Sequence, residues 1–378
     1  AIRNGEHVIV SPHRFPRVTL TTMCMNRLYH LKQTLPKNLA DNLDYPNLEY
    51  LLLNYGDQDG LDEWVRTEMK EHIDSGRLVY YRSPEQHRFH CAHAKNMATR
   101  LATGELICNV DADNITGHHF AFHVAERLQT YDFLVGCLYP NEELDSYCDQ
   151  GMAGRSAVRR AAFYDAGGFD EAMVGWGHDD LDFYARLKGL GYKGAPIDGR
   201  FLHCIAHGDA ERAAHTGVED IGGVMNPDRG TARENRERSD RNVAEGKLTL
   251  NDGNVGCGTA YEKFGAHPIT LAKTVFNKIS ICVTSMNRLH HLAQTLPQNL
   301  ADNRSYPNLE IVLLDYNSSD GLEGWARAHL GDWIEAGRLV YFKTTEPAHF
   351  KRSHARNLAI RLASGDIVCT VDADNFTG

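Results

Sequence analysis

A long internal repeat is the feature that most limits what this chain can fold into. The stretch MNRLYHLKQTLPKNLADNLDYPNLEYLLLNYGDQDGL from Met25 returns as MNRLHHLAQTLPQNLADNRSYPNLEIVLLDYNSSDGL from Met286, and GELICNVDADNITG returns as GDIVCTVDADNFTG. The offset between the copies stays constant over roughly a hundred residues, which indicates a duplicated structural unit. We therefore expect a complete unit at 1–250, a linker at 251–277 and the front half of a second unit at 278–378.

Short apolar runs alternate with amphipathic stretches inside each copy. RVTLTTM, LEYLLLNY, RLVYYRS and ELICNVDAD are bounded by turn residues and predict strands buried on both faces. In RLYHLKQTLPKNL the leucines share one helical stripe. Strands and helices in this alternation predict an α/β fold with a mainly parallel sheet, and ligands of such sheets bind beyond the carboxyl ends of the strands.

Composition and charge narrow the classes of function. Hydrophobic residues make up 42% and charged residues 24% of the 378 positions, which is an ordinary globular balance. The net charge of -10 comes without a basic block, so we expect no nucleic-acid partner. No apolar run reaches the roughly 18 residues that cross a bilayer. The nine cysteines form no CxxC pair, so we expect no disulfides, no zinc ribbon and a reducing, cytoplasmic setting.

Two carboxylates follow the last strand of each copy. They are Asp111 and Asp113 in the first VDADN, and Asp372 and Asp374 in the second. Side chains two apart on a strand share a face, and Mg²⁺ or Mn²⁺ prefers one or two carboxylates together with phosphate oxygens and water. The pair therefore suits a cation that bridges a nucleotide diphosphate. An isolated pair of this kind suits the cap of a turn equally well, so the surrounding sequence must decide.

The order of the motifs resembles the GT-A glycosyltransferases, in particular those of family 2. The resemblance rests on a strand followed by MNR and a helix, a second strand that ends in DYNSSDG, and HARNLAIRLASGDIVCTVDADN. In the first copy, GGFDEAMVGWGHDDLDFYARLKGLGY from Gly167 resembles the acceptor half of the galactosyltransferase and chondroitin-polymerase type. The match covers residues 17–210 and 278–378, and the two motifs at their proper separation make it specific.

This resemblance implies a role for particular residues of the first copy. Asp111 and Asp113 would bind Mn²⁺ or Mg²⁺ and the diphosphate, while Asp180 would be the general base and Asp179 would hold the acceptor hydroxyl. Asp179 and Asp180 also suit the first turn of the helix LDFYARLKGL, and both roles can hold at once. The remaining implied residues are His207, preferred to His203, as the metal histidine, and Trp176 and Gly177 at the acceptor.

The two copies differ where the nucleotide should bind. Members of the family usually end the second strand with Asp, which the second copy keeps as Asp315 while the first has Asn54. Thr284 of the second copy is likewise replaced by Met23. The other residues expected at the nucleotide are Asn26, His90 and Lys95, and their counterparts in the second copy include Lys351 and Arg356.

The sequence thus predicts a metal-dependent, inverting glycosyltransferase that moves a sugar from a nucleoside diphosphate, UDP in the first instance, to a glycan hydroxyl. An inactive carbohydrate-binding or nucleotide-binding protein is one alternative, against which the intact acids and His207 argue. A nucleotidyltransferase is another, but it would carry a Gly-rich, basic phosphate loop where this chain has TTMCMNRL. We expect the half-unit to dock on the first domain or on a neighbouring chain, since its sheet would otherwise stay uncovered.

Overall fold

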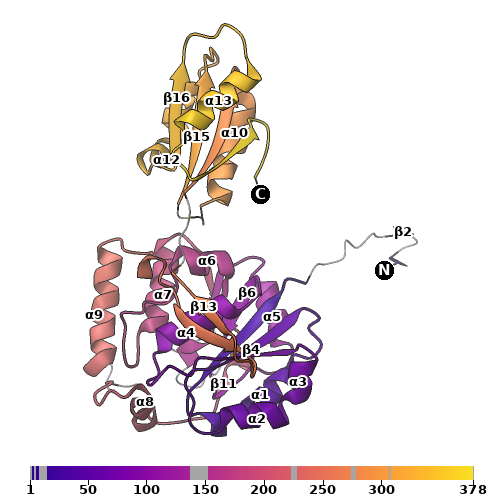
Figure 1. The fold of residues 1–378 in the computed structure, drawn as a ribbon, viewed down its shortest axis with the longest axis vertical. Helices are drawn as coiled ribbons and strands as arrows, with labels where there is room; N and C mark the ends of the chain where they lie inside the picture. The colour runs from indigo at the N-terminus through magenta and orange to yellow at the C-terminus, as the bar shows by residue number, and fades with distance from the viewer. Residues whose placement is uncertain are drawn as a thin grey trace. The chain divides into compact units, whose positions relative to one another are not determined.

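The chain divides into two units between residues 274 and 275, and each unit is built around one large sheet (Figure 1). The computed structural model describes residues 2–3, 6–7, 15–136, 152–222, 228–273, 278–304, 306 and 308–377. Each unit is described by itself. The first also contains the two-residue strands β1 (Ile2–Arg3) and β2 (Glu6–His7), which pair with each other.

A nine-stranded sheet forms the centre of the first unit. In spatial order its strands are β10 (Gly194–Pro196), β8 (Phe133–Val135), β9 (Ser156–Arg159), β6 (Leu106–Asn109), β3 (Val18–Cys24), β4 (Leu48–Asn54), β5 (Leu78–Arg82), β12 (Gly258–Glu262) and β13 (Pro268–Leu271). The central strands β6, β3, β4 and β5 run parallel, as do β8 and β10. β9 is antiparallel to both β6 and β8, and β12 is antiparallel to β5 and β13.

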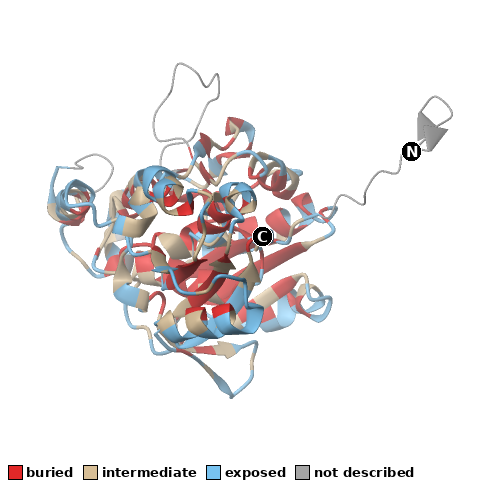
Figure 2. Ribbon diagram, turned by 90° about the horizontal axis from the view of Figure 1, so that it is seen from above, coloured by how far each residue is buried: buried red, intermediate tan, exposed pale blue. Residues whose placement is uncertain are grey.

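Helices cover both faces of this sheet because its strands carry apolar residues on both sides. On β4, Tyr50 and Leu52 pack with the helices of one face, while Leu51 and Leu53 pack with α4 on the other. The strands at the centre of this unit are mostly buried, as their red colour in Figure 2 shows. The helices are α1 (Leu28–Asp41), α2 (Leu61–Glu68), α3 (Lys70–Asp74), α4 (Cys91–Leu101), α5 (Phe120–Arg127), α6 (Arg160–Asp165), α7 (Asp179–Gly189), α8 (Asp209–Thr216) and α9 (Gly230–Ala244), with short 3₁₀ turns η1 (Met152–Gly154), η2 (Gly199–Phe201) and η3 (Asn251–Gly253).

The second unit repeats the central part of the first. Its four strands all run parallel, in the order β16 (Leu339–Thr344), β15 (Leu309–Tyr316), β14 (Ile279–Ser285) and β17 (Ile367–Asp372). Its helices are α10 (Leu289–Asp302), α11 (Leu322–His329), α12 (Gly331–Glu335) and α13 (Arg352–Leu362). This order matches β5, β4, β3 and β6 of the first unit. The predicted α/β class with a mainly parallel sheet is therefore confirmed.

The segment predicted to be a linker contributes a hairpin to the first sheet. β12 and β13 lie within 251–277, and β12 pairs with β5 through Tyr261 opposite Arg82. Ala260 and Leu271 are buried against the core residues of α4 and β4. This hairpin has no counterpart in the repeat and is held by contacts to a strand far away in the sequence, and the bounds of the linker stay a prediction.

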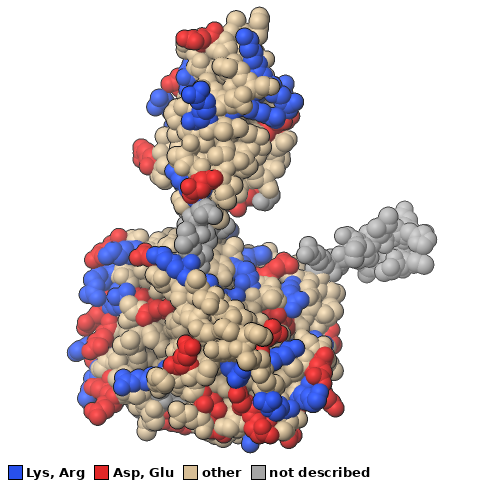
Figure 3. Space-filling view, in the orientation of Figure 1, with Lys and Arg blue, Asp and Glu red and all other residues tan. Residues whose placement is uncertain are grey.

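Charged side chains of both signs lie on the surface of the molecule (Figure 3). On the face drawn in Figure 3, basic and acidic side chains are mixed. All seven cysteines in the described part of the chain are free. Over the same residues, none of the helices combines the length and the apolar character needed to cross a membrane.

Candidate active site

Asp111 and Asp113 lie in the turn that follows β6. Asn109, the last residue of that strand, donates its Nδ2 to Asp111 Oδ1 over 2.9 Å and to the carbonyl oxygen of Gly154 over 2.7 Å. Burial raises the pKa of Asp111, which the charge of Lys95 opposes and that of Asp113 reinforces. The first acid of the motif is thus fixed at a defined place at the carboxyl end of the sheet.

A short antiparallel ladder brings His207 to Asp113. It joins β7 (Asn114–Ile115) and β11 (His203–Cys204), and beyond it the Ile205 amide donates to the carbonyl oxygen of Asp113 over 2.8 Å. His207 Nε2 then lies 3.2 Å from Asp113 Oδ2. Burial alone would raise the pKa of Asp113, but the hydrogen bond and charge of His207 outweigh it and hold this pKa below its usual value. His203 is exposed on β11.

Arg155 contacts both strands of this ladder, and no sequence motif predicted this role. Its guanidinium group is fully buried and donates Nη1 to the carbonyl oxygens of Ile115 (3.1 Å) and Phe201, and Nη2 to that of His203 (3.3 Å). A buried arginine needs such a set of acceptors to offset its lost hydration. Arg155 therefore links the loop that contains Asp113 with the strand that precedes His207.

The donor types around Asp113 suit a hard divalent cation, and two of them are close together. Asp113 and His207 offer a carboxylate and an imidazole 3.2 Å apart, and His207 Nδ1 is buried without a hydrogen-bond partner. Asp111 is held by Asn109. Among the described residues, no group of three or more His, Cys, Asp or Glu is arranged to hold an ion. The chain thus presents part of a site, and the cation stays a prediction.

The second pair of acids, Asp179 and Asp180, begins α7 and directly follows the turn GWGH. Gly175 and Gly177 have φ values of 71° and 97°, where a side chain is disfavoured. α9 packs against this turn: Thr231 Oγ1 and the Trp176 backbone exchange hydrogen bonds of 3.1 Å, and Asn235 Nδ2 donates to the Gly177 carbonyl oxygen over 2.9 Å. The structure therefore places Trp176 and Gly177 next to the acids, in contact with α9.

Lys95 of α4 joins both acids of α7. Its Nζ lies 2.9 Å from Asp179 Oδ2 and 2.6 Å from Asp180 Oδ1, and the lysine side chain is only 3% exposed. Burial and the neighbouring Asp179 raise the pKa of Asp180 to about 7, against the influence of Lys95. For Asp179, burial is outweighed by Lys95, which holds that pKa below its usual value. One acid of the pair is thus ionised while the other takes up a proton near neutral pH.

Gly154 marks the point where the two acidic pairs approach each other. A Cβ atom on this residue would lie 2.6 Å from Asp111 Oδ2 and 3.5 Å from Asp180 Oδ2. Any larger residue would have to displace the carboxylate of Asp111. The glycine therefore lets residues that are far apart in the sequence face one small region, a role that its sequence context did not reveal.

The residues expected at the nucleotide make contacts inside the protein. Met23 is buried in the apolar cluster of α4 and β4. Asn54 Nδ2 donates to Asp62 Oδ1 (2.9 Å) and to the Tyr80 hydroxyl (3.0 Å). Asn26 Oδ1 accepts from the Gln58 amide (2.8 Å), and His90 Nδ1 caps α4 by accepting from the His93 amide (3.2 Å). Their roles toward a nucleotide stay predictions.

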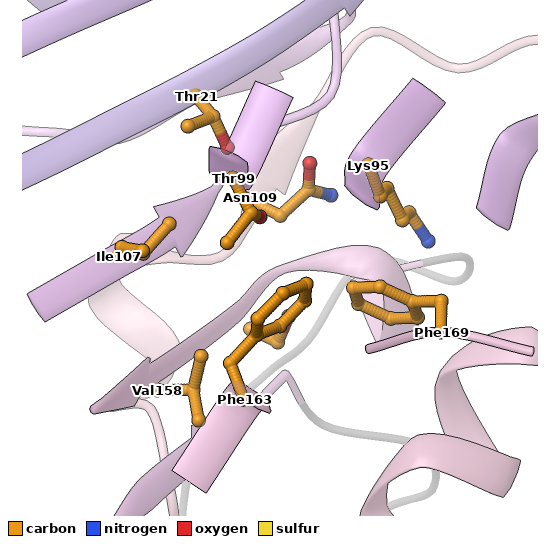
Figure 4. A pocket seen from close by; sticks show the side chains of 9 residues that line it. Thr21, Lys95, Thr99, Ile107, Asn109, Val158, Phe163 and Phe169 are labelled. Carbon is orange, nitrogen blue, oxygen red and sulfur yellow. The ribbon is translucent and has the colours of Figure 1, made fainter. Parts of the chain in front are cut away.

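A cavity of about 10 Å³ lies beneath the site, lined by Asn109, Lys95, Phe163 and Phe169 among others (Figure 4). That volume is about what one water molecule needs. It is far too small for a sugar or a nucleotide, so substrates would have to bind on the open side of the acids.

Two family models match the chain. The model described as glycosyl transferase family 2 matches residues 22–155 and 280–377, together more than half of the chain. The model described as the N-terminal domain of galactosyltransferase matches residues 139–208, the first part of which lies outside the described residues. A comparison with curated proteins gives no match.

Several solved structures align with parts of the chain. The mannosyltransferase PcManGT from Pyrobaculum calidifontis, in complex with GDP-Man and Mn²⁺, is 24% identical over 49% of this chain and 56% of its own, with a TM-score of 0.40. TarS 1–349 from S. aureus, in complex with UDP-GlcNAc, is 14% identical over 48% and 56%, with a TM-score of 0.39. GalNAc-T7 with UDP, GalNAc and Mn²⁺ is 15% identical over 49% and 42%, with a TM-score of 0.40. The chain thus spans about half the length of these structures.

Proposed function

This chain belongs to glycosyl transferase family 2, and on that premise we propose that its first unit transfers a sugar from a nucleoside diphosphate, UDP in the first instance, to a hydroxyl group of a glycan. The transfer inverts the anomeric carbon. The observation that carries the proposal is the position of Asp180: a partly buried acid with a pKa of about 7 that approaches Asp111 across Gly154.

Asp180 acts as the general base. The attacking hydroxyl is a weak nucleophile, so its proton must leave as the bond from the anomeric carbon to the diphosphate breaks. A carboxyl group with a pKa near neutral is ionised often enough to accept that proton and basic enough to hold it. Asp179, kept ionised by Lys95, accepts a hydrogen bond from the acceptor sugar and orients it, with Trp176 and Gly177 beside it.

A divalent cation, Mn²⁺ or Mg²⁺, would be held by Asp113 and His207, with Asp111 as the further carboxylate and His203 as the second choice of histidine. Such an ion stabilises the negative charge of the departing nucleoside diphosphate as a Lewis acid. What supports this assignment is the 3.2 Å approach of His207 to Asp113 and the buried, unpartnered Nδ1 of His207 among the described residues.

The proposal extends to the setting of the reaction. The nucleotide sugar and the glycan are the partners, and the free cysteines of the described part suit a cytoplasmic location. The half-unit is proposed to dock on the first domain or on a neighbouring chain, because Ile367 and Val368 of β17 are 49% and 37% exposed.

The test is a screen of nucleotide sugars against glycan acceptors with Mn²⁺ or Mg²⁺, followed by kinetics of Asp180→Asn. We expect turnover to fall by about 10²-fold while the affinity for the donor stays nearly unchanged, since proton removal matters in the transition state and not in the ground state. Asp74→Asn, an exposed acid on α3, is the control and should behave like the parent.

Nuclear magnetic resonance of the product gives an independent check of the mechanism. Inversion at the anomeric carbon is expected. A product with retained configuration would overturn the role of Asp180 as base, and transfer of a nucleotidyl group in place of a sugar would overturn the reaction class.

A further inference from the structure

We propose that Lys95 is a positioning residue of this reaction: it holds Asp179 and Asp180 in the geometry that the acceptor needs, and it does not bind the nucleotide as the sequence predicted. The inference rests on the proposed function and deepens it. A residue of α4, a helix expected to face the nucleotide, would thus act on the acids of α7, which are expected to face the acceptor.

The contacts of Lys95 carry this assignment. The ammonium group lies within 2.9 Å of one oxygen of each acid and 4.9 Å from the centre of the Phe169 ring. The side chain is 3% exposed, and the two acids are 11% and 14% exposed. An ammonium group with this burial and two short ion pairs is already committed to the protein. Reaching a diphosphate would require it to leave both acids uncompensated.

The charges around Asp179 and Asp180 explain why the positive charge of Lys95 is needed beside them. Asp179 and Asp180 are consecutive, and Asp111 faces the same region across Gly154. Like charges that lie close together in a poorly hydrated site repel strongly. Lys95 offsets this repulsion for the acids of α7, and without it their carboxylates would turn away from each other and from the acceptor.

The second unit shows what the same helix position contacts among the described residues 278–377. Arg356 of α13 corresponds to Lys95, and its Nη2 lies 2.7 Å from Asp372 Oδ1, the counterpart of Asp111. Arg352 binds the other oxygen of Asp372 over 2.9 Å. In the first unit Asp111 is held by Asn109 instead. The cation at this helix position thus pairs with the strand-end acid in the second unit and with the acids of α7 in the first.

The geometry also distinguishes the two oxygens of Asp180. Lys95 holds Oδ1 at 2.6 Å, while Oδ2 faces Gly154, where Asp111 Oδ2 also points. Lys95 thus fixes the carboxyl group by one oxygen and presents the other to the region between the acidic pairs. That is the arrangement that a base requires, because the proton-accepting oxygen must be held in place before the acceptor binds.

The experiment is a double-mutant cycle on transfer, with Lys95→Met and Lys95→Arg in the parent and in Asp180→Asn. In the parent, Lys95→Met should lower kcat by about 10²-fold, the size expected for a misplaced catalytic group. KM for the donor should change by less than about threefold. Lys95→Arg keeps the charge and should recover kcat to within about tenfold of the parent. In Asp180→Asn, Lys95→Met should cost less than about threefold, since the group that it positions is already lost.

Three results would overturn the inference. An equal loss of kcat in both backgrounds would show that Lys95 acts independently of Asp180. A raised KM for the donor with unchanged kcat would make Lys95 a nucleotide ligand, as the sequence predicted. Failure of Lys95→Arg to recover kcat, although it unfolds at the temperature of the parent, would exclude a role that depends on charge.

The design separates this inference from the proposed function. If the parent transfers no sugar, the proposed function fails and the positioning role falls with it. The melting temperatures of Lys95→Met, Asp179→Asn and their combination then test the ion pair between these residues. Additive changes would show that Lys95 and Asp179 do not interact, and would overturn the inference. Lys70→Met, which removes an exposed ion pair on α3, is the matched control in every series and should keep the kinetics of the parent.

Discussion

The two units contain the same four strands, yet the last strand of each has a different environment. In the first unit β6 lies between β3 and β9, and its residues are 6% exposed or less. In the second unit β17 is an edge strand, and Ile367 and Val368, which correspond to Leu106 and Ile107, are 49% and 37% exposed. The repeat therefore determines which segments become strands, whereas burial depends on the elements that follow β6 in the first unit.

The same contrast holds for polar residues at the end of the second strand. In the second unit Asp315 accepts a hydrogen bond of 2.6 Å from the Tyr341 hydroxyl. In the first unit Asn54 takes the place of that acid, and the corresponding tyrosine, Tyr80, donates to Asp62. The carboxylate that accepts from the tyrosine thus lies at the end of the strand in the second unit and in the first turn of α2 in the first unit. The change from Asp to Asn is thus balanced inside the protein and need not reflect a different nucleotide.

The largest expected difference between the units concerns the metal acids. Asp113→Ala should lower transfer by about 10³-fold or more and should abolish the Mn²⁺ dependence of UDP binding, because it removes the acid that lies beside His207. The matched variant in the second unit, Asp374→Ala, should leave transfer unchanged. Asp374 is exposed, and residues 278–377, as the structure describes them, contain neither a general base nor a histidine beside this acid.

Isothermal titration of UDP with and without Mn²⁺ measures the binding part of this pair. Loss of transfer in Asp374→Ala, with an intact fold by circular dichroism, would show that the second unit completes a working site. Equal metal dependence in the parent and Asp113→Ala would remove the cation from the first.

The pH dependence of turnover should belong to the first unit alone. Because the pKa of Asp180 is raised to about 7, its carboxyl group is protonated below that pH, and kcat should fall about tenfold for each pH unit of further acidification. The sign for stability is opposite: a raised pKa favours the protonated acid in the folded state, so this group contributes most at low pH and loses its contribution as the pH rises from 3.8 to about 7.

Acid inactivation through Asp180 should therefore be reversible and leave the circular dichroism spectrum unchanged. A profile of kcat that stays flat between pH 5 and pH 8 would contradict the assignment of the base. A profile that follows the loss of secondary structure would attribute the effect to unfolding.

The sequence predicted best what the repeat or a local pattern encodes. The four parallel strands β3, β4, β5 and β6, the acids after β6 and the acids that begin α7 were located from runs and motifs. The matches to family 2 and to the galactosyltransferase model confirm the family. His207 was preferred to His203 on spacing, and the structure places it 3.2 Å from Asp113. Its role as a ligand stays a prediction.

What the sequence could not predict depends on contacts between distant segments. Lys95 lies 84 residues from Asp179 in the chain, so no local pattern reveals that they form an ion pair. Arg155 and Gly154 matter because of what surrounds them in space, and neither belongs to a motif. The β12 and β13 hairpin was taken for a linker because its apolar residues find their partners on α4 and β4.

The smallest expected effect tests whether Asn54 is a structural residue. Asn54→Asp would place a carboxylate where Nδ2 now donates to Asp62 over 2.9 Å, so it should destabilise the first unit by about 1 to 3 kcal/mol. Adding Asp62→Asn recreates the arrangement of Asp315 and Tyr341 and should restore most of that loss. Scanning calorimetry measures the stability, and kcat and UDP affinity should both stay within about threefold of the parent, because these side chains hold β4 to α2 and Tyr80. If Asn54→Asp instead strengthens UDP binding by tenfold or more at unchanged stability, this position contacts the nucleotide, and the difference between the two units reflects donor choice after all.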